Sequence, residues 1–340
     1  MTKPHLILGV GELLWDVLPN ATRLGGAPAN FAVMAGRLGN RAAILSRIGR
    51  DDFGRQAIDR LTPMPVETSL LQVDPIHETG RVTVSIVDHE PHYTIHKPTA
   101  WDFLELSDEW IQNVERADAI CFGSLAQRHP QSRQTIQTLV AEASASCIRV
   151  FDVNLRAPFY SAEVMQESLE LASVVKMNEN EVPLVLDLLN LNLLNLDERN
   201  VDLANLDLLE MNTDFAARTA DASLPTSTDF IRKAAEQLLS VFPELQMVAI
   251  TRGARGSLLV TRDEWDEHRG FPIKVVDAVG AGDAFTAAIT HYMLRGADLA
   301  TLNEAGNRWG GWLASQSGAM PALPDNVRDA IAAAIEKTAG

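Results

Sequence analysis

Basic residues are scarce in this chain of 340 residues, which carries 29 lysines and arginines against 45 acidic residues and a formal net charge of −16. Proteins that bind nucleic acid or anionic membranes cluster positive charge to neutralise phosphate groups, and this sequence has no basic run. We therefore expect no nucleic acid and no membrane among the partners of this protein.

Cysteines and long apolar runs are scarce as well. The two cysteines, Cys121 and Cys147, have apolar neighbours, which favours buried reduced thiols over a disulfide or a reactive thiol. No apolar stretch approaches the roughly 18 residues of a membrane span. Glu12 and Asp16 stand where a signal peptide needs apolar residues. We expect a cytoplasmic protein.

Apolar residues make up 46% of the chain and charged residues 22%, a composition typical of a globular protein with a sizeable core. Candidate strands alternate with candidate helices. The strands are expected at 5–9, 43–48, 118–123, 148–153, 173–177 and 247–252, and the helices at 28–38, 53–61, 130–145, 161–171, 281–295, 299–315 and 325–338. This alternation predicts an α/β fold with three layers, α/β/α, around a mainly parallel sheet.

Two segments break the alternation. Residues 81–86 and 92–95 have polar and apolar side chains in period two and predict a hairpin in a small β-sheet or lid. Residues 184–229 are rich in leucine, asparagine and aspartate, and predict either a helix that runs into a long surface excursion or a partner-binding helix.

The common nucleotide-binding fingerprints are missing. A Walker A loop needs a lysine directly after a glycine, and no lysine of this chain follows one. The pair Gly9 and Gly11 is followed by Leu14, where a dinucleotide-binding loop wants a third glycine. If the chain binds a nucleotide, another motif must hold its phosphates.

Such a motif lies near the C-terminus, where Gly280, Ala281, Gly282 and Asp283 separate a β-like run from an alanine-rich helix. Small residues let an anion approach the N–H groups at a helix start, where the helix dipole favours negative charge. An acid beside a bound phosphate is costly, so Asp283 indicates a catalytic role. The alternative is that Asp283 only complements the helix dipole and that the glycines only allow close packing.

A second cluster combines Gly25, Gly26 and Asn30, with Asp16 upstream. The glycines permit close approach of a ligand, while the carboxylate and the amide could together hold the hydroxyls of a polyol. A Gly-Gly turn that only leads into a helix is the alternative interpretation.

Residues 25–54 and 277–290 resemble, in order and separation, the two signatures of the ribokinase-like (PfkB) sugar kinases. The N-x-x-E motif at 178–181, the T-x-G-x-x-G loop at 251–256 and Gly318 resemble further motifs of that family. Residues 11–12, 122–128 and 152–156 look most like fructokinase members. The resemblance implies one kinase domain over 1–340, with a lid at about 12–26 and 79–105.

The resemblance also implies roles for individual residues. Asp283 takes the place of the catalytic base, and Gly280, Ala281 and Gly282 that of the anion hole. The residues at the positions of the family's sugar contacts are Asp16, Gly26, Asn30 and Arg156. The implied nucleotide contacts are Asn178, Glu181, Thr251, Gly253, Gly256 and Asn307, with Glu181 ordering Mg²⁺ through water. Asp277, Val279 and Gly318 match ligands of the monovalent cation, such as K⁺, that many members need.

We therefore expect an ATP-dependent kinase that phosphorylates a primary hydroxyl of a small sugar, with D-fructose first. A 2-keto-3-deoxygluconate kinase comes next, since Arg156 could pair with a sugar-acid carboxylate, unless it forms a structural salt bridge. A ribokinase or nucleoside kinase and a sugar-binding protein without turnover remain further alternatives. The resemblance also implies a homodimer formed through the lid.

Overall fold

The computed structural model describes residues 4–87, 90–191 and 227–337 of the chain. Its strands are β1 (Leu6–Val10), β2 (Leu14–Leu18), β3 (Ala21–Gly25), β4 (Arg41–Leu45), β5 (Arg47–Gly49), β6 (Gln72–Asp74), β7 (Gly80–Val87), β8 (Glu90–Ile95), β9 (Ala119–Gly123), β10 (Ile148–Asp152), β11 (Val174–Asn178), β12 (Met247–Thr251), β13 (Ser257–Val260) and β14 (Trp265–His268).

The α-helices are α1 (Ala27–Arg37), α2 (Asp52–Leu61), α3 (Asp108–Val114), α4 (Pro130–Glu142), α5 (Ala162–Leu171), α6 (Glu181–Leu188), α8 (Thr228–Val241), α9 (Ala281–Met293), α10 (Leu299–Ala314) and α11 (Asp325–Glu336). Short 3₁₀ helices are η1 (Ala100–Phe103), η2 (Leu125–Gln127) and η4 (Gly253–Arg255). Most of the predicted elements lie within a few residues of these bounds, whereas α3, α8, β2, β3, β6, β13 and β14 were not expected from the sequence.

The central sheet has eight strands in the order β14-β13-β12-β11-β10-β9-β1-β4. Strands β12, β11, β10, β9, β1 and β4 pair in parallel, and β13 and β14 extend the sheet with antiparallel pairing. The prediction of a mainly parallel sheet is therefore confirmed. In such a sheet, ligands bind beyond the carboxyl ends of the parallel strands.

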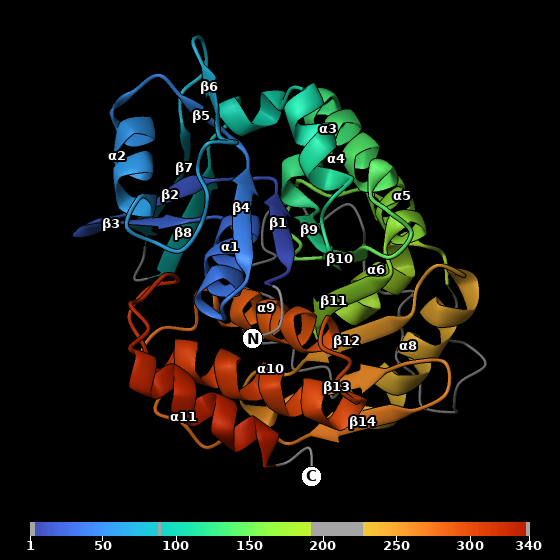
Figure 1. The fold of residues 1–340 in the computed structure, drawn as a ribbon. Coiled ribbons are helices and arrows are strands. Elements are labelled where there is room, and N and C mark those ends of the chain that lie inside the picture. Colours follow the sequence, from blue (N-terminus) through green and yellow to red (C-terminus); the bar gives the residue numbers. More distant parts are fainter. Residues whose placement is uncertain (1–3, 88–89, 192–226, 338–340) are drawn as a thin grey trace.

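Helices cover both faces of the sheet (Figure 1). Along β1, Ile7 belongs to a core that contains residues of α1, α9, α10 and α11, while Leu8 and Val10 belong to the core that contains residues of α4, α5, α6 and α8. The alternation of buried side chains along one strand thus serves two apolar layers, as expected for a strand with helices on both faces. This arrangement confirms the three-layer fold.

A smaller sheet has the order β3-β2-β7-β8 and lies beside α2 in Figure 1. The predicted hairpin corresponds to β7 and β8. The strands expected from the sequence did not include β2 and β3, which form a second hairpin. Burial falls along both strands away from the end at Leu14 and Gly25, so Trp15 and Leu24 are buried while Asp16 and Arg23 are half-buried.

Three other expectations concern segments away from this sheet. Helix α6 occupies the start of the predicted excursion 184–229 and α8 begins at Thr228, while residues 192–226 lie outside the described residues. Cys121 and Cys147 are buried free thiols, as predicted. Within the described ranges, no helix is long and apolar enough to span a bilayer.

Candidate active site

Helix α9 begins at the predicted anion cradle. Gly280 caps the helix with a left-handed φ of 80°, and a Cβ atom there would lie 2.8 Å from the Cβ of Ala319. The N–H groups of Gly282 and Asp283 have no acceptor in the part of the chain that is described, as expected in the first turn of a helix. The N–H of Ala281 instead donates to the carbonyl of Ala278 at 3.2 Å. Two of the first N–H groups are therefore available to an anion, and that of Ala281 is not.

The carboxylate of Asp283 lies in the first turn of α9. Its Oδ2 accepts a hydrogen bond of 2.7 Å from Nδ2 of Asn30, a buried side chain in the first turn of α1. Burial raises the pKa of Asp283 to about 6; Asp152 adds to this effect, while Lys176, Asn30 and Arg156 oppose it. A carboxylate with such a pKa is ionised at neutral pH and close to the range in which a general base works best.

A buried ion pair lies next to the cradle, and our sequence analysis did not single it out. Lys176 on β11 and Asp152 on β10 are direct neighbours in the parallel register, with Nζ 3.0 Å from Oδ1 of Asp152. A Cβ atom on Gly282 would lie 2.8 Å from the same Nζ. Thr286 of α9 also donates to Oδ2 of Asp152, at 3.3 Å. The strand therefore places a positive charge against the first turn of α9.

This lysine stays charged despite its burial. Burial lowers the pKa of Lys176, but the carboxylates of Asp152, Glu181 and Asp283 outweigh burial and the pKa is raised. A signal was present in the sequence, because a lysine inside an otherwise apolar strand next to the N-x-x-E motif is rarely buried without a charged partner.

The glycine cluster lies where a loop after β1 meets the start of α1. Gly26 caps α1 with a φ of 110°, and a Cβ atom on it would lie 2.3 Å from the carbonyl oxygen of Glu12. Oε1 of Glu12 accepts the N–H of Ala27 at 3.1 Å, while its Oε2 is buried without a partner among the described residues. Burial raises the pKa of Glu12 to about 7. Glu12, absent from our predicted site residues, thus holds the turn in which Gly26 stands.

Asp16 and Arg156 complete the predicted sugar side. Burial raises the pKa of Asp16, whereas the charges of Arg156 and Arg23 lower it. Arg156 is exposed and donates to the carbonyl of Leu155 at 3.0 Å, and it forms no ion pair with the described residues. The alternative of a structural salt bridge at Arg156 is therefore not what the structure contains. Its charge acts on Asp16, Glu12 and Asp283 together, so these groups lie around one region.

The N-x-x-E motif lies at the carboxyl end of β11. Oδ1 of Asn178 accepts the N–H groups of Asn180 and Glu181 at 3.0 and 3.1 Å. The two carboxylate oxygens of Glu181 accept the N–H groups of Asn178 and Leu155 at 2.7 and 2.8 Å. Glu181 is buried, which raises its pKa. It connects the ends of β10 and β11, and each of its oxygens keeps a lone pair for a water molecule.

The T-x-G-x-x-G loop lies beside this motif, because Thr251 on β12 pairs with Asn178 on β11. Gly253 and Gly256 have φ values of 57° and 84°. A Cβ atom on Gly256 would lie 2.0 Å from the carbonyl oxygen of His268, whereas the place of a Cβ on Gly253 is open. Asn307 on α10 lies next to this loop: its amide donates to Ser257, the register partner of Thr251 on β13, at 2.6 Å, and to the carbonyl of Asn303 at 2.8 Å.

Asp277, in the loop before α9, does not fit the predicted site for a monovalent cation. Its carboxylate forms an ion pair with the guanidinium of Arg23. Oδ1 also accepts the N–H of Val279 and Oδ2 that of Gly318, both at 3.1 Å. A cation bound to this carboxylate would lie against a fixed positive charge. The three predicted ligands are thus brought together at the carboxylate of Asp277, which is paired with an arginine.

A magnesium ion fits the site better. No group of three or more histidine, cysteine, aspartate or glutamate side chains that could hold a metal occurs in residues 4–87, 90–191 and 227–337. Mg²⁺ in kinases is usually held by substrate phosphates, water molecules and one or two carboxylates, so no such group is needed. Glu181, which keeps lone pairs beside Asn178, suits contact through water.

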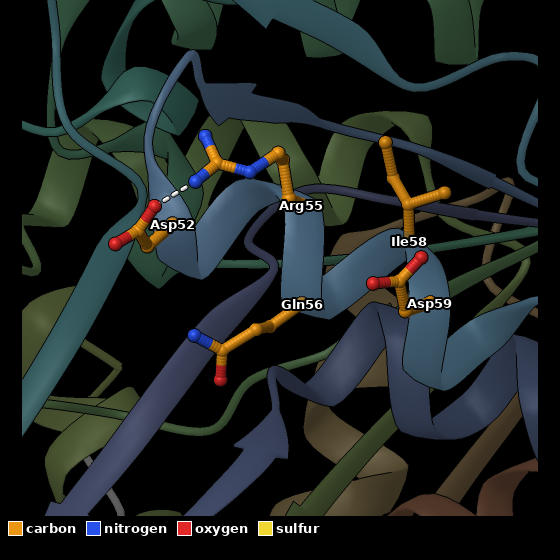
Figure 2. Close-up of a pocket in the computed structure, with 5 residues that line it drawn as sticks. All are labelled: Asp52, Arg55, Gln56, Ile58 and Asp59. Atoms are coloured by element: carbon orange, nitrogen blue, oxygen red, sulfur yellow. Dashed lines mark hydrogen bonds and ion pairs between the residues drawn. The ribbon is translucent and has the colours of Figure 1, made fainter.

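Figure 2 shows a hollow of the protein in close-up. It lies along α2 and is lined by Asp52, Arg55, Gln56, Ile58 and Asp59. Arg55 and Asp52 pair across one turn of the helix, and their side chains are largely exposed. None of the predicted site residues lines this hollow, and a surface shaped by a single helix offers no convergent set of polar groups.

Comparison with known families and proteins agrees with this arrangement. The family described as pfkB family carbohydrate kinase matches residues 19–326. Fructokinase from Vibrio alginolyticus is 27% identical over 334 residues, which cover 92% of this chain and 94% of that protein.

Two solved structures have the same fold. Fructokinase from Vibrio cholerae O395, in a form with fructose, ADP and potassium ion bound, has a TM-score of 0.73 at 24% identity and covers 97% of this chain and 98% of its own. Fructokinase from Xylella fastidiosa with bound ATP has a TM-score of 0.74 at 21% identity, with coverages of 98% and 99%. At these identities the likeness in structure concerns the fold.

Proposed function

The chain belongs to the pfkB family of carbohydrate kinases, and from this premise we propose that it transfers the γ-phosphoryl group of ATP to a primary hydroxyl of D-fructose. The observation that carries the proposal is the position of Asp283. Its carboxylate stands in the first turn of α9, between the amide of Asn30 and the N–H groups that an anion can reach. One acid can therefore serve an alcohol while the helix start binds the phosphoryl group that the alcohol attacks.

Asp283 acts as the general base in this proposal. The sugar oxygen forms a bond to the γ-phosphorus, its proton passes to Asp283, and the bond from phosphorus to the bridging oxygen breaks with its electron pair, so that ADP leaves. Asn30 keeps the carboxylate in place by its hydrogen bond of 2.7 Å. A base of this kind typically accelerates a reaction by about 10²- to 10⁴-fold.

The start of α9 stabilises the charge on the transferring group. The N–H groups of Gly282 and Asp283 are free to donate, and the ammonium of Lys176 lies beside Gly282. Phosphoryl transfer depends mostly on positioning and on the neutralisation of charge. The helix start and the buried lysine together can do this without a Walker A lysine.

The nucleotide binds in this proposal where β11 and β12 end. The residues that lie together there are Asn178, Glu181, Thr251 and Gly253. Glu181 would hold Mg²⁺ through water, and the ion would supply neutralisation of the charge on the phosphates. Asn307 supports the adjacent packing of α10, because its amide is engaged there.

Asp16 and Arg156 bind the sugar hydroxyls, and Gly26 lets the sugar approach the backbone. The smaller sheet, which carries Asp16, is the lid in this proposal. A dimer formed through the lid stays a prediction, as does the cytoplasmic location, which the two buried thiols favour.

Arg156 also favours a second candidate, a kinase of 2-keto-3-deoxygluconate. Its guanidinium is exposed and unpaired by any described carboxylate, so it could form a bidentate pair with a sugar acid. Fructose has no carboxylate and would use the same guanidinium only for its hydroxyls.

A coupled assay of ADP formation with fructose, 2-keto-3-deoxygluconate, ribose and adenosine tests these candidates. We expect the highest kcat/KM with fructose. A preference for the sugar acid that Arg156→Ala abolishes would replace fructose by the second candidate, and a preference for ribose or adenosine would overturn both. Sugar-dependent thermal stabilisation without turnover on any of them would indicate a binding protein.

A further inference from the structure

Arg23 joins the smaller sheet to the loop before α9. It lies on β3 directly opposite Asp16 on β2, so both side chains project from the same face of the hairpin. Its guanidinium forms an ion pair with Asp277, a residue 254 positions away in the sequence. Nη2 of Arg23 also reaches Ser317 at 3.5 Å, in the turn that contains Gly318.

This contact satisfies the carboxylate of Asp277. The side chain of Asp277 is 13% exposed and that of Arg23 is 38% exposed, so the acid is the more buried member of the pair. Besides the guanidinium, it accepts the N–H groups of Val279 and Gly318. Val279 and Gly280 lead directly into the first turn of α9. A positive charge at Asp277 therefore stabilises the loop that ends in the anion cradle.

In a kinase of this kind the same carboxylate would be expected to hold a monovalent cation, and the Vibrio cholerae fructokinase structure contains a potassium ion. Here the positive charge belongs to the chain. A potassium ion at Asp277 would have to displace the guanidinium or lie beside a like charge, and both are unfavourable. An arginine side chain is permanently charged, so its presence does not depend on the salt around the protein.

We propose that Arg23 takes the place of the monovalent cation at Asp277, so that this kinase works without potassium. The proposal rests on the proposed sugar kinase activity for its consequence in turnover, but the exchange of charge at Asp277 can be tested without any substrate. Arg23 is a positioning residue here, since it acts through Asp277 on the loop before α9.

The first test is thermal unfolding of the protein without sugar or nucleotide, in KCl and in tetramethylammonium chloride of equal ionic strength. We expect the same Tm for the wild type in both salts. Arg23→Ala empties the place beside Asp277, so KCl should raise the Tm of this variant over tetramethylammonium by about 2 °C or more. Arg55→Ala, which removes a surface ion pair on α2, is the matched control and should not respond to KCl.

The second test measures turnover in the same two salts. The wild type should be equally active in both, while Arg23→Ala should lose activity in tetramethylammonium and regain it in KCl by about 5-fold or more, the effect of roughly 1 kcal/mol. The activity of Arg23→Lys should remain independent of KCl.

Activation of the wild type by KCl would overturn the proposal, and so would an Arg23→Ala variant that does not respond to KCl in either test. If Arg23→Ala does not fold, the proposal is judged by whether KCl changes the Tm and the activity of the wild type. A wild type that phosphorylates no sugar would refute the proposed function and leave the unfolding test intact.

Discussion

Asn30 donates a hydrogen bond of 2.7 Å to the carboxylate of Asp283, and this bond joins the first turn of α1 to the first turn of α9. It connects the glycine cluster to the anion cradle, two motifs that lie far apart in the sequence. The amide also stabilises the ionised form of Asp283 against the effect of burial. The same side chain thus holds the carboxylate in place and lowers its affinity for a proton.

The pH dependence of turnover should report this hydrogen bond. Because the pKa of Asp283 is about 6, kcat/KM of the wild type should fall as the pH drops through this value and the carboxylate becomes protonated. Asn30→Ala removes a group that favours the charged form, so the acid limb should move to higher pH. Asn113→Ala, which removes an exposed amide on α3, is the control and should leave the limb in place. If Asn30→Ala leaves the acid limb where it is, the hydrogen bond from Asn30 does not influence the pKa of Asp283.

Glu12 should make the stability of the protein depend on pH. Its pKa is raised from 4.5 to about 7 by burial, so the folded state holds the proton more tightly than the unfolded chain. This contribution is present below pH 4.5 and is lost as the pH rises to about 7. It amounts to roughly 3 kcal/mol at most, from the conversion of a pKa difference to free energy.

Glu12→Gln keeps an acceptor for the N–H of Ala27 and removes the charge. Its free energy of unfolding should therefore exceed that of the wild type at pH 8 and approach it at low pH. Denaturant unfolding of both proteins across this range measures the difference. A difference that does not vary with pH would show that Glu12 does not titrate in the folded protein.

The buried pair of Lys176 and Asp152 should contribute both to stability and to turnover, and a double variant can separate these two roles. Lys176→Met leaves Asp152 buried without its partner, which typically costs about 3–5 kcal/mol of stability. In Lys176→Met with Asp152→Asn the uncompensated charge is gone, so most of the stability should return. Turnover should stay low in both variants, because neither places a positive charge against Gly282. Recovery of turnover together with stability would limit the pair to a structural role.

Much of this site could be predicted from the sequence because its motifs are local. Glycines, an acid and an alanine-rich helix follow one another at 280–283, so the cradle and Asp283 are visible without any knowledge of the fold. The same holds for the parallel sheet, whose short apolar strands alternate with helices. The hairpin of β2 and β3 was missed because Gly25 and Gly26 favour a loop, although they lie at the end of β3 and at the cap of α1.

The contacts that join distant segments could not be predicted in this way. The pairing of Lys176 with Asp152 depends on the register of β10 and β11, and that of Arg23 with Asp277 on how the smaller sheet meets the loop before α9. A likeness to the family implied a cation at Asp277 because the ligand residues are present in the sequence. The arginine that faces them comes from a strand that the sequence pattern did not indicate.

The central claim is that Asp283 accepts the proton of the sugar hydroxyl, and the variant Asp283→Asn tests it most directly. The amide keeps the shape of the side chain and cannot take the proton, so kcat should fall by about 10²- to 10⁴-fold. Fructose should still raise the Tm of the variant as it does that of the wild type, and Asp298→Asn, at the cap of α10, should keep normal turnover. Near-normal kcat in Asp283→Asn, with folding and sugar binding intact, would contradict the account.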